Sequence, residues 1–167
     1  MSPAPEMTQP FHSPGVTRRS MSKVGSDLSA TKNRKIPTVL IVDDEPHVLE
    51  VRRLLLEKSG YGAIVADSGR QALEIFKRTV VDAIILDYMM PVMDGGRTAR
   101  EIRKLDRAVP IILSTASVRV PAAVLQLFTA VVPKGSGPRR LLKTLEKQIL
   151  RACRLRQRNP LNLARND

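Results

Sequence analysis

The chain has 167 residues, enough for one ordinary domain with flanking segments. No apolar run reaches the ~18–20 residues of a membrane-spanning helix, and the start lacks the pattern of a secretory signal. A single cysteine, Cys153, excludes a disulfide framework and an all-cysteine zinc site, and two histidines exclude a histidine-rich metal centre. We therefore expect a cytoplasmic protein without a membrane span.

The net charge of +12 is concentrated at the two ends of the chain. Residues 1–35 carry +4, residues 36–134 carry +1 and residues 135–167 carry +7. Because the middle is nearly neutral, the high charge does not require a basic groove on a globular domain. We expect 1–35, which is proline-rich and lacks periodicity, to be a disordered tail. The folded domain is expected at 36–156, followed by a basic tail at 157–167.

Five apolar strands alternate with helical patterns along the middle of the chain. The continuous run 38–42 is typical of a strand buried on both faces of a parallel sheet. Ser59–Gly60 ends the helix after it, and Asp67 or Ser68 is expected to cap the next one. The expected elements are strand 38–42, a helix from 46 carrying Val48, Val51 and Leu54–Leu56, strand 63–66, a helix across 72–76, strand 83–86, a helix around 98–105, strand 111–113, a short helix from 121, strand 130–132 and a helix from about 138.

This alternation has the form (βα)5 with short connections. It predicts an α/β, doubly wound, flavodoxin-like fold with a five-stranded parallel sheet and helices on both faces. In such folds the ligand site lies beyond the carboxyl ends of the strands, near the point where the strand order reverses. The residues that follow each strand are therefore the candidates for function.

Charged and hydroxyl side chains follow four of the five expected strands. Asp43 and Asp44 end the first strand and Asp87 the third, while Thr115 and Lys134 end the fourth and fifth. Clustered carboxylates repel one another, and a hard divalent cation such as Mg²⁺ relieves that repulsion because it prefers oxygen ligands. A carboxylate beside such an ion can attack a phosphoryl group, with the lysine and the hydroxyl holding phosphoryl oxygens. Taken singly, each aspartate is more simply a helix cap or a solvated loop residue.

Four segments in this order resemble the receiver domain of two-component response regulators. They are Val39–Pro46 (VLIVDDEP), Ile85–Gly95 (ILDYMMPVMDG), Pro110–Ala116 (PIILSTA) and Lys134. The resemblance covers residues 37 to about 152. It implies a phosphorelay function in which Asp87 accepts a phosphoryl group. It also implies a Mg²⁺ cofactor held directly by Asp44 and Asp87, by the backbone carbonyl of Met89, and by Asp43 through water.

The resemblance implies roles for three further positions. Thr115 matches the switch hydroxyl, Lys134 the lysine that pairs with the phosphate, and Ala116 a small residue that leaves room for the donor. A histidine kinase or phosphotransfer protein then supplies the phosphoryl group, and a downstream protein receives the signal by contact. The chain is expected to be a stand-alone receiver, not a metabolic enzyme, that catalyses its own phosphorylation and dephosphorylation.

The sequence departs from the family pattern near its last strand. Gly135 follows the lysine where the family usually has proline, and Val131 replaces an aromatic residue. The spacing between Thr115 and Lys134 is short, which predicts an abbreviated fourth helix. In the last helix, an apolar stripe through Leu141 and Leu145 faces the core. The basic residues on the other side are expected to be solvated or to contact an acidic protein, anionic lipid or nucleic acid. Cys153 is expected to be buried or at the boundary.

Two other functions remain open at this level. One is a degenerate receiver-like module that binds proteins without phosphotransfer. The other is nucleic-acid binding through the basic tails, which predicts a steep dependence on salt. Direct DNA binding is the less favoured, because only nine residues follow Arg158. Labelling with a small phosphodonor separates the first from an active switch.

Overall fold

The computed structural model describes residues 36–116 and 119–158. The tail expected at 1–35 lies outside the described residues. The C-terminal tail expected from 157 does so from residue 159 onward, and residues 157 and 158 are the end of the last helix. Within the described residues, no helix combines the length and the apolar character needed to cross a bilayer.

A five-stranded parallel sheet forms the centre of the fold, in the order β2-β1-β3-β4-β5. Both β2 and β3 pair with β1, so the strand order reverses there, as the doubly wound prediction requires. The elements are β1 (Thr38–Val42), α1 (Pro46–Lys58), β2 (Gly62–Ala66), α2 (Gly69–Arg78), β3 (Ala83–Leu86), α3 (Gly95–Leu105), β4 (Ile111–Thr115), α4 (Ala122–Leu125), β5 (Ala130–Pro133), the 3₁₀ turn η1 (Lys134–Ser136) and α5 (Pro138–Arg158). The predicted fold class is confirmed.

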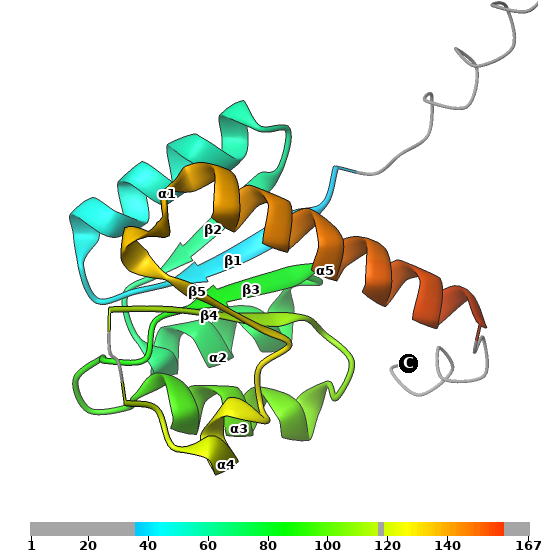
Figure 1. Ribbon diagram of the computed structural model, residues 1–167. Coiled ribbons are helices and arrows are strands. Elements are labelled where there is room, and N and C mark those ends of the chain that lie inside the picture. The colour runs from blue at the N-terminus through cyan, green and yellow to red at the C-terminus, as the bar shows by residue number, and fades with distance from the viewer. Residues whose placement is uncertain (1–35, 117–118, 159–167) are drawn as a thin grey trace, which may run out of the picture. The chain divides into compact units, whose positions relative to one another are not determined.

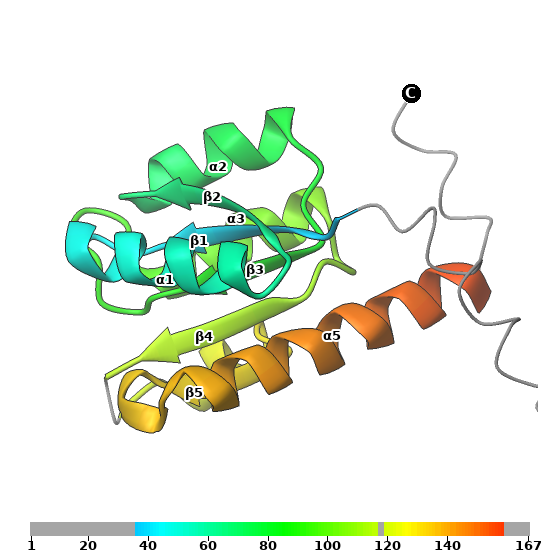
Figure 2. The ribbon, with the colours of Figure 1, turned by 90° about the horizontal axis from the view of Figure 1, so that it is seen from above.

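Helices cover both faces of the sheet. Figure 1 shows α1 and α5 on one face and α2 and α3 on the other, and Figure 2 shows the α1 and α5 side from above. Side chains alternate along β1, so that Val39 and Ile41 pack toward α1 and α5 while Leu40 and Val42 pack toward α2 and α3. Since both faces are covered, the central strands β1, β3 and β4 carry continuous apolar runs, which is why they were recognisable in the sequence.

The buried face of α1 includes only part of the apolar residues expected on this helix. Leu49, Arg52 and Leu56 are buried, whereas Val51 and Leu54 are exposed. The buried residues are spaced three and four apart, so they form one stripe along the helix. Of the apolar residues expected to recur along this helix, Leu56 therefore lies on the buried stripe, whereas Val51 and Leu54 do not.

Three further details of the helices can be compared with the predictions. The helix expected around 98–105 begins at Gly95, because the Asp94 side chain caps it by accepting a hydrogen bond from the Arg97 N–H at 2.7 Å. The fourth helix has four residues, which confirms the abbreviated helix. Cys153 is exposed, contrary to expectation.

Candidate functional site

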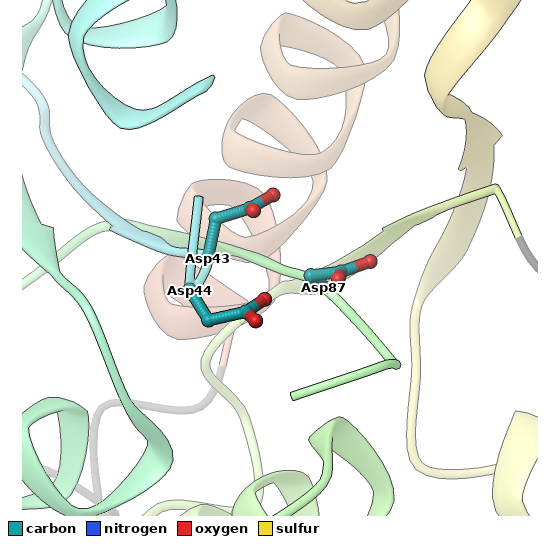
Figure 3. Close-up of side chains that lie close together, drawn as sticks. All are labelled: Asp43, Asp44 and Asp87. Atoms are coloured by element: carbon teal, nitrogen blue, oxygen red, sulfur yellow. The ribbon is translucent and has the colours of Figure 1, made fainter. Parts of the chain in front are cut away.

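Three carboxylates meet where β1 and β3 end, at the reversal of strand order. The side chains of Asp43, Asp44 and Asp87 each offer a ligand oxygen, and these oxygens lie within 4.8 Å of one another. Figure 3 shows the three carboxylates close together. Their backbones are held by the sheet, because the Asp43 N–H donates to Ala66 O at 3.1 Å and the Asp87 N–H to Val42 O at 2.9 Å. The predicted convergence of these aspartates is therefore present.

Lys134, the residue after β5, reaches the same rim. Its Nζ lies 3.0 Å from Asp43 Oδ2, 3.3 Å from Asp87 Oδ2 and 3.0 Å from Glu45 Oε1. The lysine pKa is raised: burial disfavours the ammonium, but the hydrogen bonds to Glu45 and Asp43 and the charges of Asp87 and Asp43 outweigh it. The ammonium is thus shared among three carboxylates, and it can move toward new negative charge at the rim.

Asp43 is the most enclosed of the acidic groups. Its side chain is fully buried and accepts hydrogen bonds from the Arg52 Nη1 at 3.0 Å, from the Glu45 N–H at 3.2 Å and from Lys134. Arg52 also donates through Nη2 to Ser114 Oγ at 2.7 Å. Both oxygens of Asp43 are therefore already engaged by cations or backbone, whereas Asp44 and Asp87 line the pocket.

Asp87 combines burial with an unsatisfied oxygen. Its side chain is 4% exposed, and its Oδ1 is buried without a hydrogen-bond partner in the part of the chain that the structure describes. Burial raises the pKa of Asp87, partly offset by the Lys134 charge and increased again by the Asp43 charge. An unpartnered buried carboxylate oxygen is costly, so Oδ1 is suited to a ligand that brings positive charge.

The loop after Asp87 is fixed by backbone contacts. The Gly95 N–H donates to Tyr88 O at 2.9 Å, which closes the loop between β3 and α3. Within it, the Met93 N–H donates to Pro91 O at 2.6 Å, and Val92 between them has a φ of 65°. This is a γ-turn with a positive φ at its centre, a conformation that a β-branched residue rarely adopts.

These groups line one open pocket of about 260 Å³. Thr115 and Ala116 reach it from the end of β4, where Thr115 pairs in register with Pro133 of β5. The pocket is lined by Asp44, Glu45, Asp87, Met89, Thr115, Ala116 and Lys134. All the residues predicted for the site are therefore together at this rim, with Asp43 buried directly beneath it.

The donor set fits a small hard cation. The clustered ligands are carboxylate oxygens, one of them unpartnered, and no cysteine or histidine lies among the cluster or pocket-lining residues of the described chain. Such oxygen-only sites are typical of Mg²⁺, which also retains water and binds phosphate oxygens. The site thus has the means to hold a divalent cation beside a carboxylate and an ammonium.

Two residues of the site were missed in the sequence. Glu45 was read only as part of a matching motif, yet it pairs with Lys134. Arg52 was not considered, although its positions relative to Leu49 and Leu56, three and four residues away, place it on their helix face. That spacing could have identified Arg52 as buried, but only if the face of α1 that packs against the sheet had been chosen correctly.

The sequence of the chain is similar to that of known proteins. The sequence profile of the response regulator receiver domain matches residues 39–146. Transcriptional regulatory protein GlrR of Escherichia coli K12 is 38% identical over 86 residues, covering 52% of this chain and 19% of GlrR. Autoinducer 1 sensor kinase/phosphatase LuxN of Vibrio harveyi is 38% identical over 80 residues, covering 48% of this chain and 9% of LuxN.

Solved structures agree with the sequence comparisons. The crystal structure of response regulator protein TrrA from Thermotoga maritima, in complex with Mg²⁺-BeF, superimposes with a TM-score of 0.65 at 32% identity. It covers 68% of this chain and 99% of the TrrA chain. The chain thus matches about a fifth or less of the length of GlrR and LuxN, and nearly the whole of TrrA.

Proposed function

Since residues 39–146 make the chain a member of the response regulator receiver domain family, we propose that it accepts a phosphoryl group on Asp87 in a two-component phosphorelay. The observation that carries this assignment is the buried, unpartnered Oδ1 of Asp87, which lies among two further carboxylates and within 3.3 Å of the Lys134 ammonium from its other oxygen. In the transfer, an Asp87 oxygen forms a bond to phosphorus while the bond from phosphorus to the donor's leaving group breaks. Hydrolysis by water later returns the carboxylate.

Mg²⁺ is the cofactor of this site. We assign Asp44, Asp87 and the Met89 carbonyl as its protein ligands, with Asp43 acting through water because its own oxygens already accept from Arg52, Lys134 and the Glu45 N–H. When bound, the ion supplies neutralising charge to the phosphoryl oxygens. TrrA, the relative crystallised with Mg²⁺-BeF, supports Mg²⁺ as the cofactor.

Lys134 and Thr115 serve the phosphorylated state. Lys134 already bridges Asp43 and Asp87, so added negative charge on Asp87 draws its ammonium toward the phosphoryl group and away from Asp43. Thr115 lines the pocket from β4, in position to donate its hydroxyl to a phosphoryl oxygen. These movements shift the equilibrium between inactive and active conformations.

The partners follow from the family at a coarse level. Receiver domains interact with histidine kinases, and one relative of this chain, LuxN, is itself named a sensor kinase/phosphatase. We propose that a cytoplasmic histidine kinase domain or a phosphotransfer protein is the phosphodonor here, and that a downstream protein reads the result by contact.

Labelling with acetyl phosphate and Mg²⁺, followed by intact-mass spectrometry, tests the assignment. We expect the wild type to gain one acid-labile phosphoryl group, and Asp87→Asn to gain none. Asp67→Asn is the matched control, because Asp67 directly follows β2 but is exposed and outside the cluster. Labelling of Asp87→Asn would refute the acceptor, and an unlabelled wild type would identify the degenerate interaction module instead.

A further inference from the structure

Arg52 lies on the core-facing stripe of α1, between Leu49 and Leu56. It is 8% exposed, as buried as Leu49, although the opposite side of the same helix is available to a charged residue. A buried guanidinium is costly unless its charge is paired and its N–H groups are satisfied. The carboxylate of Asp43 pairs with its charge, and Asp43 and Ser114 each accept one of its N–H groups.

Asp43 shares one oxygen between two cations. Arg52 Nη1 and Lys134 Nζ each lie 3.0 Å from its Oδ2. The two cations are not equivalent, because Lys134 is also 3.3 Å from Asp87 and 3.0 Å from Glu45 and has a more exposed side chain. Among the described residues, Arg52 forms an ion pair with Asp43 alone. The arginine is therefore the fixed partner and the lysine the transferable one.

Ser114 holds the guanidinium from the opposite side. It is 1% exposed and points to the same face of β4 as Ile112, which belongs to the core layer between the sheet and α1 and α5. The buried Ser114 hydroxyl in this largely apolar layer accepts a hydrogen bond from Arg52. The guanidinium thus links Asp43, which follows β1, to Ser114 of β4. Its charge is fixed close to the rim that carries the carboxylates.

A fixed, buried charge acts on a cation bound at the rim. Asp44 and Asp87 each offer an oxygen within 4.8 Å of one on Asp43, so a divalent ion on them lies close to the Asp43–Arg52 pair. At separations of a few ångströms, one largely buried positive charge changes the binding of a divalent cation severalfold. Arg52 offsets part of the negative charge that would otherwise attract the ion.

We propose that Arg52 is a positioning residue that pins Asp43 in a permanent ion pair and thereby lowers the affinity of the rim for Mg²⁺. This rests on the proposed Mg²⁺ site at Asp44 and Asp87. Asp43 is held in one orientation whether or not Lys134 leaves it for a phosphoryl group. Because the metal site is weaker, the fraction of it that is occupied by Mg²⁺ responds to the Mg²⁺ concentration.

The test measures Mg²⁺ affinity of the full chain by calorimetric titration with MgCl₂ after chelator treatment. We expect Arg52→Met to bind Mg²⁺ about fivefold more tightly than the wild type, since it removes one nearby positive charge. Arg52→Lys, which keeps the charge, is expected to stay within about twofold of the wild type even if its stability falls. A purely structural arginine would lower stability in both variants without this difference in affinity.

Arg53→Met is the matched control for charge. Arg53 is the next residue on the same helix, but it is paired with Glu50 and Glu57 away from the rim. Its removal changes the net charge equally, and we expect less than about a twofold change in Mg²⁺ affinity, because exposed charges are screened. If Arg52→Met does not fold, Arg52→Met/Ser114→Val replaces the donor and its acceptor together by apolar groups, and the same tightening is expected of it.

The outcomes separate this inference from the proposed function. Mg²⁺ binding by the wild type with equal or weaker binding by Arg52→Met, or with equal tightening by Arg52→Met and Arg52→Lys, overturns the role of Arg52 and leaves the metal site standing. Absence of binding in the wild type and in every variant overturns the metal site and this inference together. Tightening in Arg52→Met that is matched by Arg53→Met would also overturn it, because net charge alone would then be responsible.

Discussion

The backbone of Gly95 lies directly against the carbonyl of Asp87. A Cβ built on Gly95 would overlap that carbonyl oxygen and would lie 2.9 Å from Tyr88 Cα, both of them backbone atoms that cannot rotate away. The first residue of α3 is therefore packed against the strand end that carries the proposed phosphoacceptor. The glycine is needed here for its lack of a side chain and not for an unusual φ.

We expect Gly95→Ala to destabilise the chain by about 2–3 kcal/mol, because the added methyl group forces β3 and α3 apart. The free energy of unfolding in urea measures the change. Gly135→Ala is the control, since a Cβ there meets nothing within 4 Å, and it should alter the free energy by less than about 0.5 kcal/mol. Equal stability of Gly95→Ala and the wild type would contradict the close approach.

Val92 carries backbone strain in the loop after Asp87. It has a φ of 65°, is 90% exposed and is the one non-glycine residue with a positive φ in the described ranges. We expect Val92→Gly to raise the free energy of unfolding by about 1 kcal/mol, because relief of the strain exceeds the added entropy of the unfolded chain.

Val80→Gly is the matched control, and we expect it to change the free energy of unfolding in the opposite direction. Val80 is also exposed, at 75%, and lacks a positive φ, so the same substitution should lower stability by about 0.5–1 kcal/mol. Thermal unfolding of the two variants side by side measures both. A loss of stability in Val92→Gly as large as that in Val80→Gly would show that the loop is unstrained.

The parts that the sequence could reveal are those fixed by local patterns. Continuous apolar runs identify β1, β3 and β4 because both of their faces are covered, and parallel strands bring Asp43, Asp44 and Asp87 to one edge whatever the loops do. The parallel topology alone places these three aspartates at the same edge of the sheet. The candidate site was therefore predictable before any contact was known.

Features that depend on a neighbour from elsewhere in the chain were not predictable. Arg52 reads as a surface residue, and only Ser114, 62 residues away, and Asp43 make its burial favourable. Likewise, Gly95 and Gly96 are poor helix formers, so the sequence favours a later start for α3, whereas the Asp94 cap and the fit of Gly95 against Asp87 start it earlier. In each case a tertiary contact outweighs a local preference.

Arg103 fixes the segment that follows the shortened α4. Its Nε donates to Leu127 O at 3.0 Å and its Nη1 to Val109 O at 2.7 Å, which joins α3 to the chain on both sides of β4. Burial lowers the pKa of Arg103, opposed by Asp106, but the guanidinium remains charged. Arg103→Met should cost about 2 kcal/mol, because it removes charged hydrogen bonds and leaves the carbonyls unpaired.

Chemical denaturation measures this loss, with two comparisons. Arg103→Lys should recover little of it, since an ammonium does not reproduce the planar fork that reaches both carbonyls. Arg107→Met, at an exposed position shortly after α3, should change stability by less than about 0.5 kcal/mol. Full stability of Arg103→Met would mean that apolar packing alone holds the segment after α4.

Asp87 is expected to make the stability of the metal-free chain depend on pH. Its pKa lies above the ordinary 3.8, mainly through burial, so the unfolded chain loses this proton at lower pH than the native one. As pH rises from below 3.8 through the raised pKa, ionisation therefore favours the unfolded state. Above that range, the free energy of unfolding stays lowered by a constant amount.

Asp87→Asn removes this titration and, with it, the loss of stability that the ionised Asp87 causes. With a chelator present, we expect the variant to be more stable than the wild type at neutral pH, and the difference to vanish as pH falls below 3.8, where both native and unfolded Asp87 are protonated. Urea unfolding across this pH range measures it. Added Mg²⁺ should narrow the difference at neutral pH, because the ion stabilises the wild type through Asp87. Lower stability of Asp87→Asn at neutral pH would show that attraction to Lys134, 3.3 Å away, exceeds the cost of burying the carboxylate.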